Sequence, residues 1–475
     1  MTDWLAQQAR TRPDAPALVG ERRTLGYREL AAFAARGARD LAGAGIGPGA
    51  VVAWQADAGI RALCWLHAVL WRGATLAPVP AHIAPERLAG LTDRIRPAAV
   101  IAAEPGSAPW NRVAARRIGF AAARADGASG NPPPASDPER VLTLVRTSGS
   151  GGEAKLVPLR ARQHAASIGA ITDRLGLGAS DRWLLCMPLD HVGGLVILLR
   201  AAATGAAVVP HRDFDAARVA RALVEEPITH VSLVPTMLAR VLRALDGEPS
   251  EALRCVLVGG APADPALLSR ARARGLPVAP TWGMTEAASQ LATPAPREAA
   301  DLAFESSPGV SGRPLHGVEI RPADGRESEL RVRAPMLFDG YLDAPGGPDA
   351  DGWFATGDRG FVDAKGRVHV TGRSADRIIS GGENVDAVAV ERALRASGLV
   401  DEICVLGLPD TEWGQRVAAV FVADRDDAEL DAWARAQLGP AERPRVWKRV
   451  DALPRTSAGK PDRAALLRLL ETGSP

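Results

Sequence analysis

Short apolar runs alternate along the chain with stretches in which apolar residues recur every three or four positions. Runs with the length of strands include 50–56 (AVVAWQA), 97–104 (PAAVIAAE), 229–235 (THVSLVP) and 253–262 (LRCVLVGGAP). The helical spacing is found in 218–226 (RVARALVEE) and 265–275 (PALLSRARARG). This alternation predicts an α/β fold with largely parallel sheets.

The pattern changes twice in the last third of the chain. First come short strand-like runs with turns at Asp324-Gly325 and Lys365-Gly366, which predict antiparallel hairpins. After Arg373 a new α/β pattern begins. We therefore expect a large N-terminal domain, 1–372, of stacked α/β sheets plus a small β-barrel-like region, followed by a small α+β domain, 373–475.

Composition and charge restrict the classes of partner. A chain of 475 residues exceeds one ordinary core, and its 47% hydrophobic and 24% charged residues are typical of globular proteins. The net charge of +2, without a basic tail, argues against nucleic acid. The four cysteines are far apart and form no CxxC pair, so we expect neither a disulfide framework nor a zinc site, and a cytoplasmic location fits.

Two further segments bear on location and layout. The N-terminus lacks the basic start and apolar core of a signal peptide. The most apolar stretch, 192–210, contains Arg200 and follows Asp190 and His191, so it predicts a buried helix and strand and not a membrane span. Segment 124–139, rich in Pro, Gly, Ser and Asp, predicts an exposed connection.

The first candidate for chemistry is 144–160, LVRTSGSGGEAKLVPLR. Lysine supplies only four of the 57 basic residues, yet Lys155 stands inside this glycine-rich loop. Backbone amides of glycines, hydroxyls and a compact ammonium suit phosphate oxygens. The loop is not a Walker A motif, because Ala154 precedes the lysine, Leu156 follows it and Pro158 cannot open a helix smoothly. Taken alone, the loop is equally well explained as a surface turn.

The remaining motifs identify a family. The loop resembles the phosphate loop of the adenylate-forming ligases, the acyl-CoA synthetase superfamily. Six further stretches follow in the order that this family shows: 188–195 (PLDHVGGL), 256–262 (VLVGGAP), 281–289 (TWGMTEAAS), 352–360 (GWFATGDRG), 370–385 (VTGRSADRIISGGENV) and 454–463 (PRTSAGKPDR). Because the N-terminal opening is also similar, the resemblance covers nearly the whole chain.

The resemblance implies a two-step reaction. A carboxylate attacks the α-phosphate of ATP, pyrophosphate leaves, and the acyl-adenylate is attacked by the thiol of coenzyme A. The first step collects negative charge, so donors and cations must face the phosphates. By resemblance, the clamp on the β- and γ-phosphates consists of Thr147, Ser148, Gly149, Ser150, Gly151, Gly152 and Lys155.

The other motifs receive roles in the same way. Trp282 would lie against adenine, with Gly260, Ala261 and Gly283 beside it. Thr285 would donate to the α-phosphate, and Glu286 would hold Mg²⁺. Asp358 would accept the ribose hydroxyls, with Arg373 as a further donor, and Lys460 on a mobile C-terminal domain would be the catalytic lysine. His191 would lie at the acyl substrate. Taken singly, these residues have ordinary explanations: a helix N-cap for Thr285, a turn aspartate, a surface lysine and a core histidine.

The choice of substrate depends on finer resemblance. The Pro-Leu-x-His pattern at His191 is typical of acyl and aryl CoA ligases, whereas amino-acid-activating domains carry an aspartate nearby. Stretches such as GMTEAASQ and LPDTEWGQ are similar to those of the 2-succinylbenzoate–CoA ligases of menaquinone biosynthesis. That acid has two carboxylates, so its spare one needs a polar or cationic partner, for which Arg200 is a candidate. Alternatives are another aryl or acyl CoA ligase, an enzyme that loads a carrier protein, and a binding module without catalysis.

Several positions depart from the family pattern. Ser150-Gly151 replaces two hydroxyls in the loop, Ala154 and Leu156 replace the residues that usually flank the lysine, and Ala375 occupies the usual hinge position. We expect these changes to affect loop mobility, hinge kinetics and CoA contacts more than adenylation. The sequence leaves open whether the chain forms a homo-oligomer.

Overall fold

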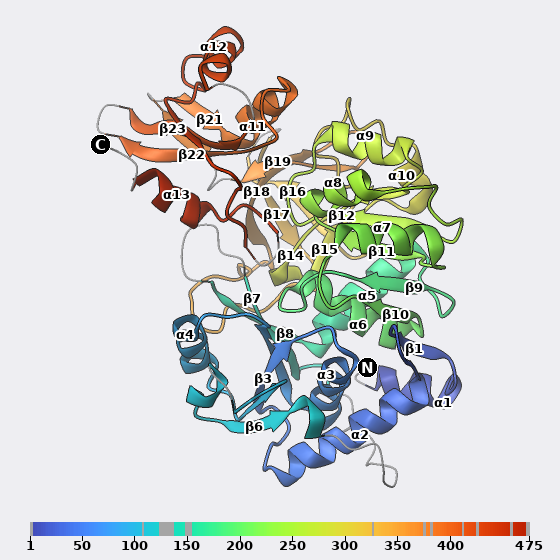
Figure 1. The fold of residues 1–475 in the computed structure, drawn as a ribbon. Coiled ribbons are helices and arrows are strands. Elements are labelled where there is room, and N and C mark those ends of the chain that lie inside the picture. Colours follow the sequence, from blue (N-terminus) through green and yellow to red (C-terminus); the bar gives the residue numbers. More distant parts are fainter. Residues whose placement is uncertain are drawn as a thin grey trace.

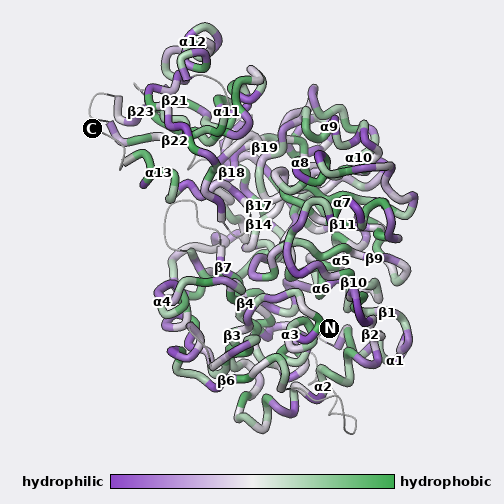
Figure 2. Tube along the Cα trace, viewed as in Figure 1, coloured by the Kyte–Doolittle hydropathy of each residue, from purple (hydrophilic) through white to green (hydrophobic). Residues whose placement is uncertain are grey.

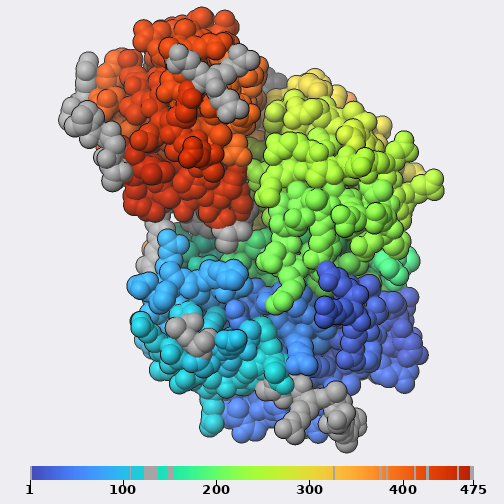
Figure 3. Space-filling model, in the orientation of Figure 1, coloured from blue at the N-terminus to red at the C-terminus, as the bar shows by residue number. Residues whose placement is uncertain are grey.

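The computed structural model describes residues 3–106, 109–122, 137–147, 154–324, 327–373, 377–380, 383–410, 413–423, 427–456 and 459–471. Figure 1 shows a large body built from the first three quarters of the chain and a smaller one that carries the C-terminus. The space-filling view shows the smaller body seated against the part of the larger one that is coloured green (Figure 3).

A six-stranded sheet forms one layer of the large body, in the order β6-β5-β3-β4-β7-β8. Its strands pair in parallel, except that β7 and β8 form an antiparallel hairpin. The strands are β3 (Val51–Ala56), β4 (Thr75–Pro80), β5 (Ala99–Ala102), β6 (Arg116–Gly119), β7 (Val141–Arg146) and β8 (Leu156–Arg160). The helices of this region are α1 (Trp4–Thr11), α2 (Tyr27–Gly43), α3 (Ile60–Arg72) and α4 (Pro85–Ile95), with 3₁₀ turns at Trp110–Arg112 and Phe120–Ala122.

A seven-stranded sheet forms the second layer, in the order β13-β12-β11-β9-β10-β1-β2, and only β1 and β2 pair antiparallel. The strands are β1 (Pro16–Val19), β2 (Thr24–Gly26), β9 (Arg182–Leu185), β10 (Ala207–Pro210), β11 (His230–Leu233), β12 (Cys255–Val258) and β13 (Val278–Pro280). The helices are α5 (Ala161–Leu175), α6 (Val192–Thr204), α7 (Ala216–Glu225), α8 (Pro235–Ala244), α9 (Pro265–Ala273) and α10 (Pro296–Ala300).

Antiparallel strands follow the two layers. β14 (Trp282–Met284) and β15 (Ser289–Ala292) form a short hairpin, joined by the 3₁₀ turn Thr285–Ala287. A four-stranded sheet has the order β16-β17-β18-β19, with β16 (Glu319–Pro322), β17 (Ser328–Arg333), β18 (Phe354–Val362) and β19 (Val368–Arg373).

The C-terminal body has its own sheet, in the order β21-β20-β23-β22, with β24 parallel to β23. The strands are β20 (Arg377–Ser380), β21 (Glu383–Asp386), β22 (Glu402–Asp410), β23 (Gly414–Val422) and β24 (Val446–Arg449). Three helices belong to it: α11 (Ala387–Ala396), α12 (Asp427–Gln437) and α13 (Arg463–Glu471). Separate apolar clusters lie in this body, so it has a core of its own.

The two layers of the large body share one core. Trp54 on β3 and Trp183 on β9 belong to the same buried cluster, together with Leu195 and Ile197 of α6. Surface helices are amphipathic: α4 buries Leu88, Leu91, Thr92 and Ile95 and carries hydrophilic residues elsewhere (Figure 2). Buried apolar area of this kind stabilises the fold by roughly 25 cal/mol per Å².

The architecture confirms the predicted fold class: stacked α/β sheets, a small antiparallel region that curls like part of a barrel, and a small α+β domain. The apolar stretch 192–210 forms α6 and β10, as predicted, and among the described residues no helix is both long and apolar enough to cross a membrane. Segment 124–139 lies mostly outside the described residues. The predicted boundary at residue 373 coincides with the end of β19 and stays a prediction.

Candidate active site

The carboxyl ends of neighbouring parallel strands meet at one edge of the seven-stranded sheet. His191 comes after β9, Gly260 after β12, and the segment 282–286 after β13. Ligands of open α/β sheets bind in the crevice at this edge. The fold therefore brings three of the sequence motifs to one place.

The hairpin of β7 and β8 carries the predicted phosphate loop. Thr147 and Lys155 close its base, since Thr147 N donates to Lys155 O at 2.9 Å and Lys155 N donates to Thr147 Oγ1 at 3.1 Å. Arg94 of α4 holds the outgoing strand, because its Nη2 donates to Ala154 O at 2.6 Å. The remaining clamp residues predicted from the sequence, Ser148, Gly149, Ser150, Gly151 and Gly152, lie outside the described residues.

The turn between β14 and β15 presents Trp282, Thr285 and Glu286. The hairpin is so tight that a β-carbon on Gly283 would lie 1.9 Å from the carbonyl oxygen of Ser289, so only glycine is accommodated there. Thr285 begins the 3₁₀ turn and is half-buried, as is Glu286. Both side chains therefore remain available to a ligand at the strand ends.

Backbone strain follows this turn directly. Ala288 and Ser289 have φ values of 50° and 128°, in the left-handed region that residues other than glycine rarely adopt. Ser167 Oγ of α5 donates to Ala288 O at 3.1 Å and so supports the strained peptide. Strain of this kind clusters at functional sites and persists only where the surroundings enforce it.

Asp358 is a buried carboxylate with two donors. Trp282 Nε1 donates to its Oδ2 and Arg373 Nε to its Oδ1, both at 2.7 Å. The sheet explains the second contact, because Arg373 of β19 is directly opposite Asp358 of β18 in the antiparallel register. Each carboxylate oxygen keeps a further lone pair, so Asp358 can still accept from a ligand hydroxyl.

Lys460 reaches this region from the C-terminal body. Thr236 Oγ1 donates to Gly459 O at 3.3 Å, and Lys460 Cε lies 3.8 Å from where a β-carbon on Gly260 would be. The charge of Lys460 also affects His191. Burial lowers the pKa of His191; the charge of Asp190 opposes this effect, and the charges of Arg146 and Lys460 add to it. A protonated histidine is thereby disfavoured, and a neutral imidazole faces the lysine.

Arg200 of α6 is a buried cation and is only 1% exposed. Its Nη2 donates to Gln290 Oε1, and its guanidinium carbon is 5.7 Å from the ring centre of Trp183. Its Nε has no hydrogen-bond partner in the part of the chain that the structure describes. Burial lowers the pKa of Arg200 to about 9, which leaves it protonated at neutral pH. Among the described residues no carboxylate pairs with it.

Gln290 links Arg200 to the hairpin that carries Thr285 and Glu286. It belongs to β15 and is directly opposite Gly283 of β14 in the hairpin. His191, the N-cap of α6, and Arg200, further along it, lie on one helix, and Arg200 contacts the β14–β15 hairpin through Gln290. Helical side chains lean towards the N-terminus of their helix, so Arg200 leans towards the end that carries His191.

Metal binding would depend on Glu286. No cluster of three or more His, Cys, Asp or Glu that could hold a metal ion is found in the described part of the chain. Mg²⁺, however, is usually held by one or two carboxylates together with phosphates and water. Glu286 fits that demand, because Tyr341 OH occupies only Oε1, at 2.7 Å, and leaves the second oxygen for a cation.

Sequence reasoning missed Tyr341, Gln290 and Arg94. Gln290 ends the stretch GMTEAASQ but was given no role, and Arg94 lies in none of the motifs; the contacts of both residues are made with segments distant in sequence. Tyr341 had one available signal: the chain contains only two tyrosines, and this one follows Gly340 in a stretch without strand or helix periodicity.

The family comparison agrees with this geometry. The chain matches the model of the AMP-binding enzyme family over residues 5–342 and that of the AMP-binding enzyme C-terminal domain over 389–460. It is 37% identical over 347 residues to a 2-succinylbenzoate–CoA ligase of Bacillus licheniformis, covering 69% of this chain and 71% of that one.

Solved structures give the same result over the full length. The chain is similar to o-succinylbenzoate CoA synthetase from Bacillus subtilis in complex with the acyl-adenylate intermediate OSB-AMP, with a TM-score of 0.89, 27% identity, and coverage of 100% of this chain and 98% of that one. A double mutant of the same synthetase bound to its product analogue OSB-NCoA gives a TM-score of 0.73 at 28% identity, with coverage of 99% and 98%. The chain belongs to the AMP-binding enzyme family, as an adenylate-forming acid–CoA ligase.

Proposed function

We propose that this ligase activates 2-succinylbenzoate and transfers it to coenzyme A. The observation that carries the proposal is Arg200, a buried guanidinium without a carboxylate partner among the described residues. A buried charge that lacks an opposite charge destabilises a protein by several kcal/mol, on the order of the penalty for removing it from water. A substrate with a second carboxylate would supply the missing charge. Names of the relatives point to the same acid.

The nucleotide half of the site supports ATP. The described clamp residues Thr147 and Lys155 would face the β- and γ-phosphates, Trp282 the adenine, and Asp358 with Arg373 the ribose. Gly260 and Ala261 leave room beside the base. Charge-assisted hydrogen bonds of this type position the α-phosphate for attack before chemistry begins.

Glu286 would hold Mg²⁺ through its second carboxylate oxygen, and the ion would neutralise charge on the leaving pyrophosphate. Thr285 adds a hydroxyl donor at the α-phosphate. A homologous synthetase has been solved with ATP and a magnesium ion, which agrees with this assignment.

Lys460 and His191 would act where the two substrates meet. The lysine would bridge the attacking carboxylate and the α-phosphate, and so stabilise charge that develops in the transition state. Its approach to Gly260 and His191 suits the adenylating step, and the greater similarity to the acyl-adenylate complex than to the product-analogue complex agrees with it. A second arrangement of the C-terminal body would then admit coenzyme A. We propose a cytoplasmic location, where both ATP and coenzyme A occur.

The test is pyrophosphate release from ATP and Mg²⁺ against a panel of acids, with and without coenzyme A. The panel includes 2-succinylbenzoate, each of its two monoesters, benzoate and a medium-chain fatty acid. We expect 2-succinylbenzoate to have the highest kcat/KM, with AMP, pyrophosphate and the thioester as products. A higher value for benzoate or the fatty acid would assign another aryl or acyl CoA ligase. Adenylation without transfer to free coenzyme A would instead indicate a carrier protein as acceptor.

A further inference from the structure

Tyr341 lies on a short segment that touches both the metal-binding turn and the phosphate loop. On one side, Phe338 N donates to Glu286 O at 2.7 Å. On the other, Leu342 N donates to Leu156 O, the start of the strand that leaves the loop, at 2.9 Å. The segment is therefore fixed by backbone hydrogen bonds to two predicted functional elements that are remote from each other in sequence.

Asp343 adds a third anchor at the same place. It accepts from Arg94 Nε at 2.5 Å, and the same arginine donates through Nη2 to Ala154 O. Arg94 and Asp343 are each about one quarter exposed, so their ion pair is partly shielded from water. The outgoing end of the phosphate loop is thus tied to the segment that carries Tyr341.

Among the described residues, the hydroxyl of Tyr341 has one hydrogen-bond partner, Glu286 Oε1, at 2.7 Å. An ionised carboxylate can only accept a hydrogen bond, so the phenol is the donor. A single fixed donor on one oxygen sets the rotation of the carboxylate and leaves the other oxygen to a cation.

The ring of Tyr341 has a different partner. Lys155 Nζ lies 4.4 Å from the ring centre, within the range of a cation–π contact. Phe338 packs edge-on against the same ring at 4.8 Å, which limits its rotation. Gly346 also contacts the ring, since a β-carbon there would lie 3.4 Å from Cε2.

We infer that Tyr341 is a positioning residue of the nucleotide site: its hydroxyl orients the Glu286 carboxylate for Mg²⁺, and its ring holds the Lys155 ammonium beside that carboxylate before ATP arrives. The inference rests on the proposed roles of Glu286 and Lys155. It gives one side chain two separable functions, and two substitutions distinguish them. Tyr341→Phe removes the hydroxyl and keeps the ring, whereas Tyr341→Leu removes both.

The hydroxyl is tested by ligand binding without turnover. The dissociation constant of α,β-methylene-ATP is measured calorimetrically over a range of Mg²⁺ concentrations, beside that of AMP. Because loss of a residue that orients a metal ligand typically weakens metal binding about 10-fold or more, Tyr341→Phe should raise the half-saturating Mg²⁺ concentration by about 10-fold. AMP lacks the phosphates that share the metal, so its affinity should change by less than about twofold. In a Glu286→Gln background, Tyr341→Phe should add no further change in the Mg²⁺ requirement.

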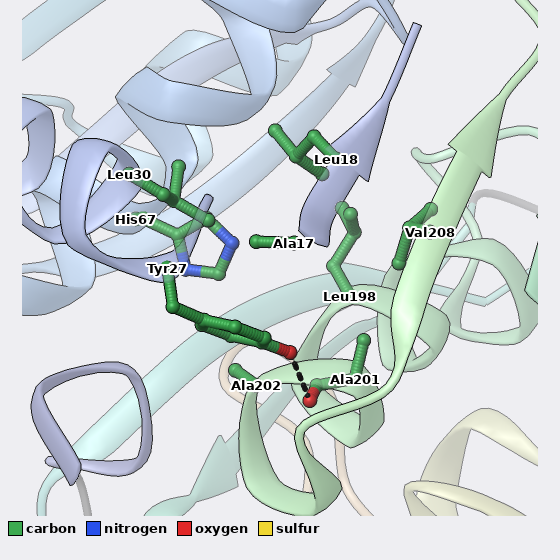
Figure 4. Close-up of a pocket in the computed structure, with 9 residues that line it drawn as sticks. All are labelled: Ala17, Leu18, Tyr27, Leu30, His67, Leu198, Ala201, Ala202 and Val208. Atoms are coloured by element: carbon green, nitrogen blue, oxygen red, sulfur yellow. Dashed lines mark hydrogen bonds between the residues drawn. The ribbon is translucent and has the colours of Figure 1, made fainter. Parts of the chain in front are cut away.

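The only other tyrosine provides a matched control. Tyr27 OH is buried and lies within hydrogen-bond distance of two carbonyl oxygens, Ala201 O at 2.8 Å and Ala206 O at 2.6 Å, beside a cavity of about 10 Å³ lined by His67 and apolar residues (Figure 4). Tyr27→Phe also removes one buried hydroxyl. It should lower the melting temperature but leave the Mg²⁺ dependence unchanged.

The ring is tested on the ligand-free protein, with no assumption about activity. The chain has only four lysines, so acetylation of each by an amine-reactive reagent can be followed by peptide mass. Lys365 and Lys448 are exposed and serve as internal references. A cation–π contact at a partly exposed site protects by about two- to fivefold. Lys155 should therefore react more slowly than the references in the wild type and in Tyr341→Phe, and at their rate in Tyr341→Leu.

The outcomes separate this inference from the proposed function. Equal Mg²⁺ requirements in wild type and Tyr341→Phe, or a Lys155 that reacts like Lys365 in the wild type, would overturn the corresponding half of the inference even if the enzyme is active. Equal weakening of AMP and of the ATP analogue would show a merely structural role. Failure of the wild type to bind the ATP analogue at all would instead overturn the proposed function. If Tyr341→Leu does not fold, the wild-type comparison among lysines still decides the role of the ring.

Discussion

The two halves of the candidate site treat their buried charges in opposite ways. On the nucleotide side, Asp358 receives hydrogen bonds from Trp282 and Arg373 before any ligand is present. On the side that we propose for the acyl substrate, Arg200 is buried deeper and has a neutral amide, Gln290, as its hydrogen-bond partner. The first charge is compensated within the protein, whereas the second would be compensated by the anion that we propose as substrate. A buried cation without an opposite charge is therefore a structural indication of substrate chemistry, and no sequence motif carries that indication.

The largest loss of activity is expected on substitution of Lys460, which we propose lies between the acyl substrate and the nucleotide. Lys460→Ala removes the cation that we propose for the adenylating transition state, and loss of such a group typically costs about 10²–10³ in rate. The decrease should be similar for every acid, because the lysine does not contact the spare carboxylate. Pyrophosphate release measures it. Conversion of supplied acyl-adenylate plus coenzyme A should remain close to the wild-type rate. Equal loss of both half-reactions, in a protein that still folds, would contradict a role limited to adenylation.

Arg200→Met should produce the next largest effect, and a selective one. Loss of one partner of a buried charge pair costs roughly 2–5 kcal/mol, so kcat/KM for 2-succinylbenzoate should fall by about 10²-fold. The monoester that keeps the reacting carboxylate free should lose much less, because esterification has already removed the charge that would pair with Arg200. The ratio of kcat/KM values for acid and ester is the measurement. A uniform decrease for both would mean that Arg200 maintains the structure of the pocket and does not read the second carboxylate.

The thermal stability of the ligand-free protein also distinguishes the two buried charges, Arg200 and Asp358. Arg200→Met replaces an uncompensated cation by an apolar side chain of similar length, so the melting temperature should stay equal or rise. Asp358→Asn weakens two charge-assisted hydrogen bonds, and since Arg373 is half exposed we expect a loss of about 1 kcal/mol. Thermal unfolding of the two variants beside the wild type checks both expectations. A large destabilisation by Arg200→Met would indicate that its charge is already compensated in the free protein.

Most of the fold could be predicted from the sequence, because its signals are local. The apolar runs at 50–56, 229–235 and 253–262 became β3, β11 and β12, and the turn at Lys365-Gly366 joins β18 to β19. Glycine motifs and single polar residues within motifs also indicated which segments carry the site. What the sequence could not give is the set of contacts between motifs. Tyr341 and Glu286 are 55 positions apart, and Trp282 and Asp358 are 76 apart, so only tertiary packing pairs them.

The smallest effect is expected on substitution of Trp282. Its contact with Asp358 adds to the role that the motif alone predicts. The sequence suggested an indole that lies against adenine, a role that phenylalanine could also fill. The structure adds an indole N–H that donates to Asp358, which no phenyl ring provides. Trp282→Phe should therefore keep the aromatic face but lose one donor on the carboxylate proposed for the ribose. Because Arg373 and water still hydrogen-bond to Asp358, we expect a loss of about 1 kcal/mol, or about fivefold in the affinity for AMP. Binding of 2′,3′-dideoxyadenosine monophosphate supplies the control, since it has no ribose hydroxyls to contact Asp358. If both nucleotides weaken equally, the indole acts through its ring alone, and the buried carboxylate is held well enough by Arg373.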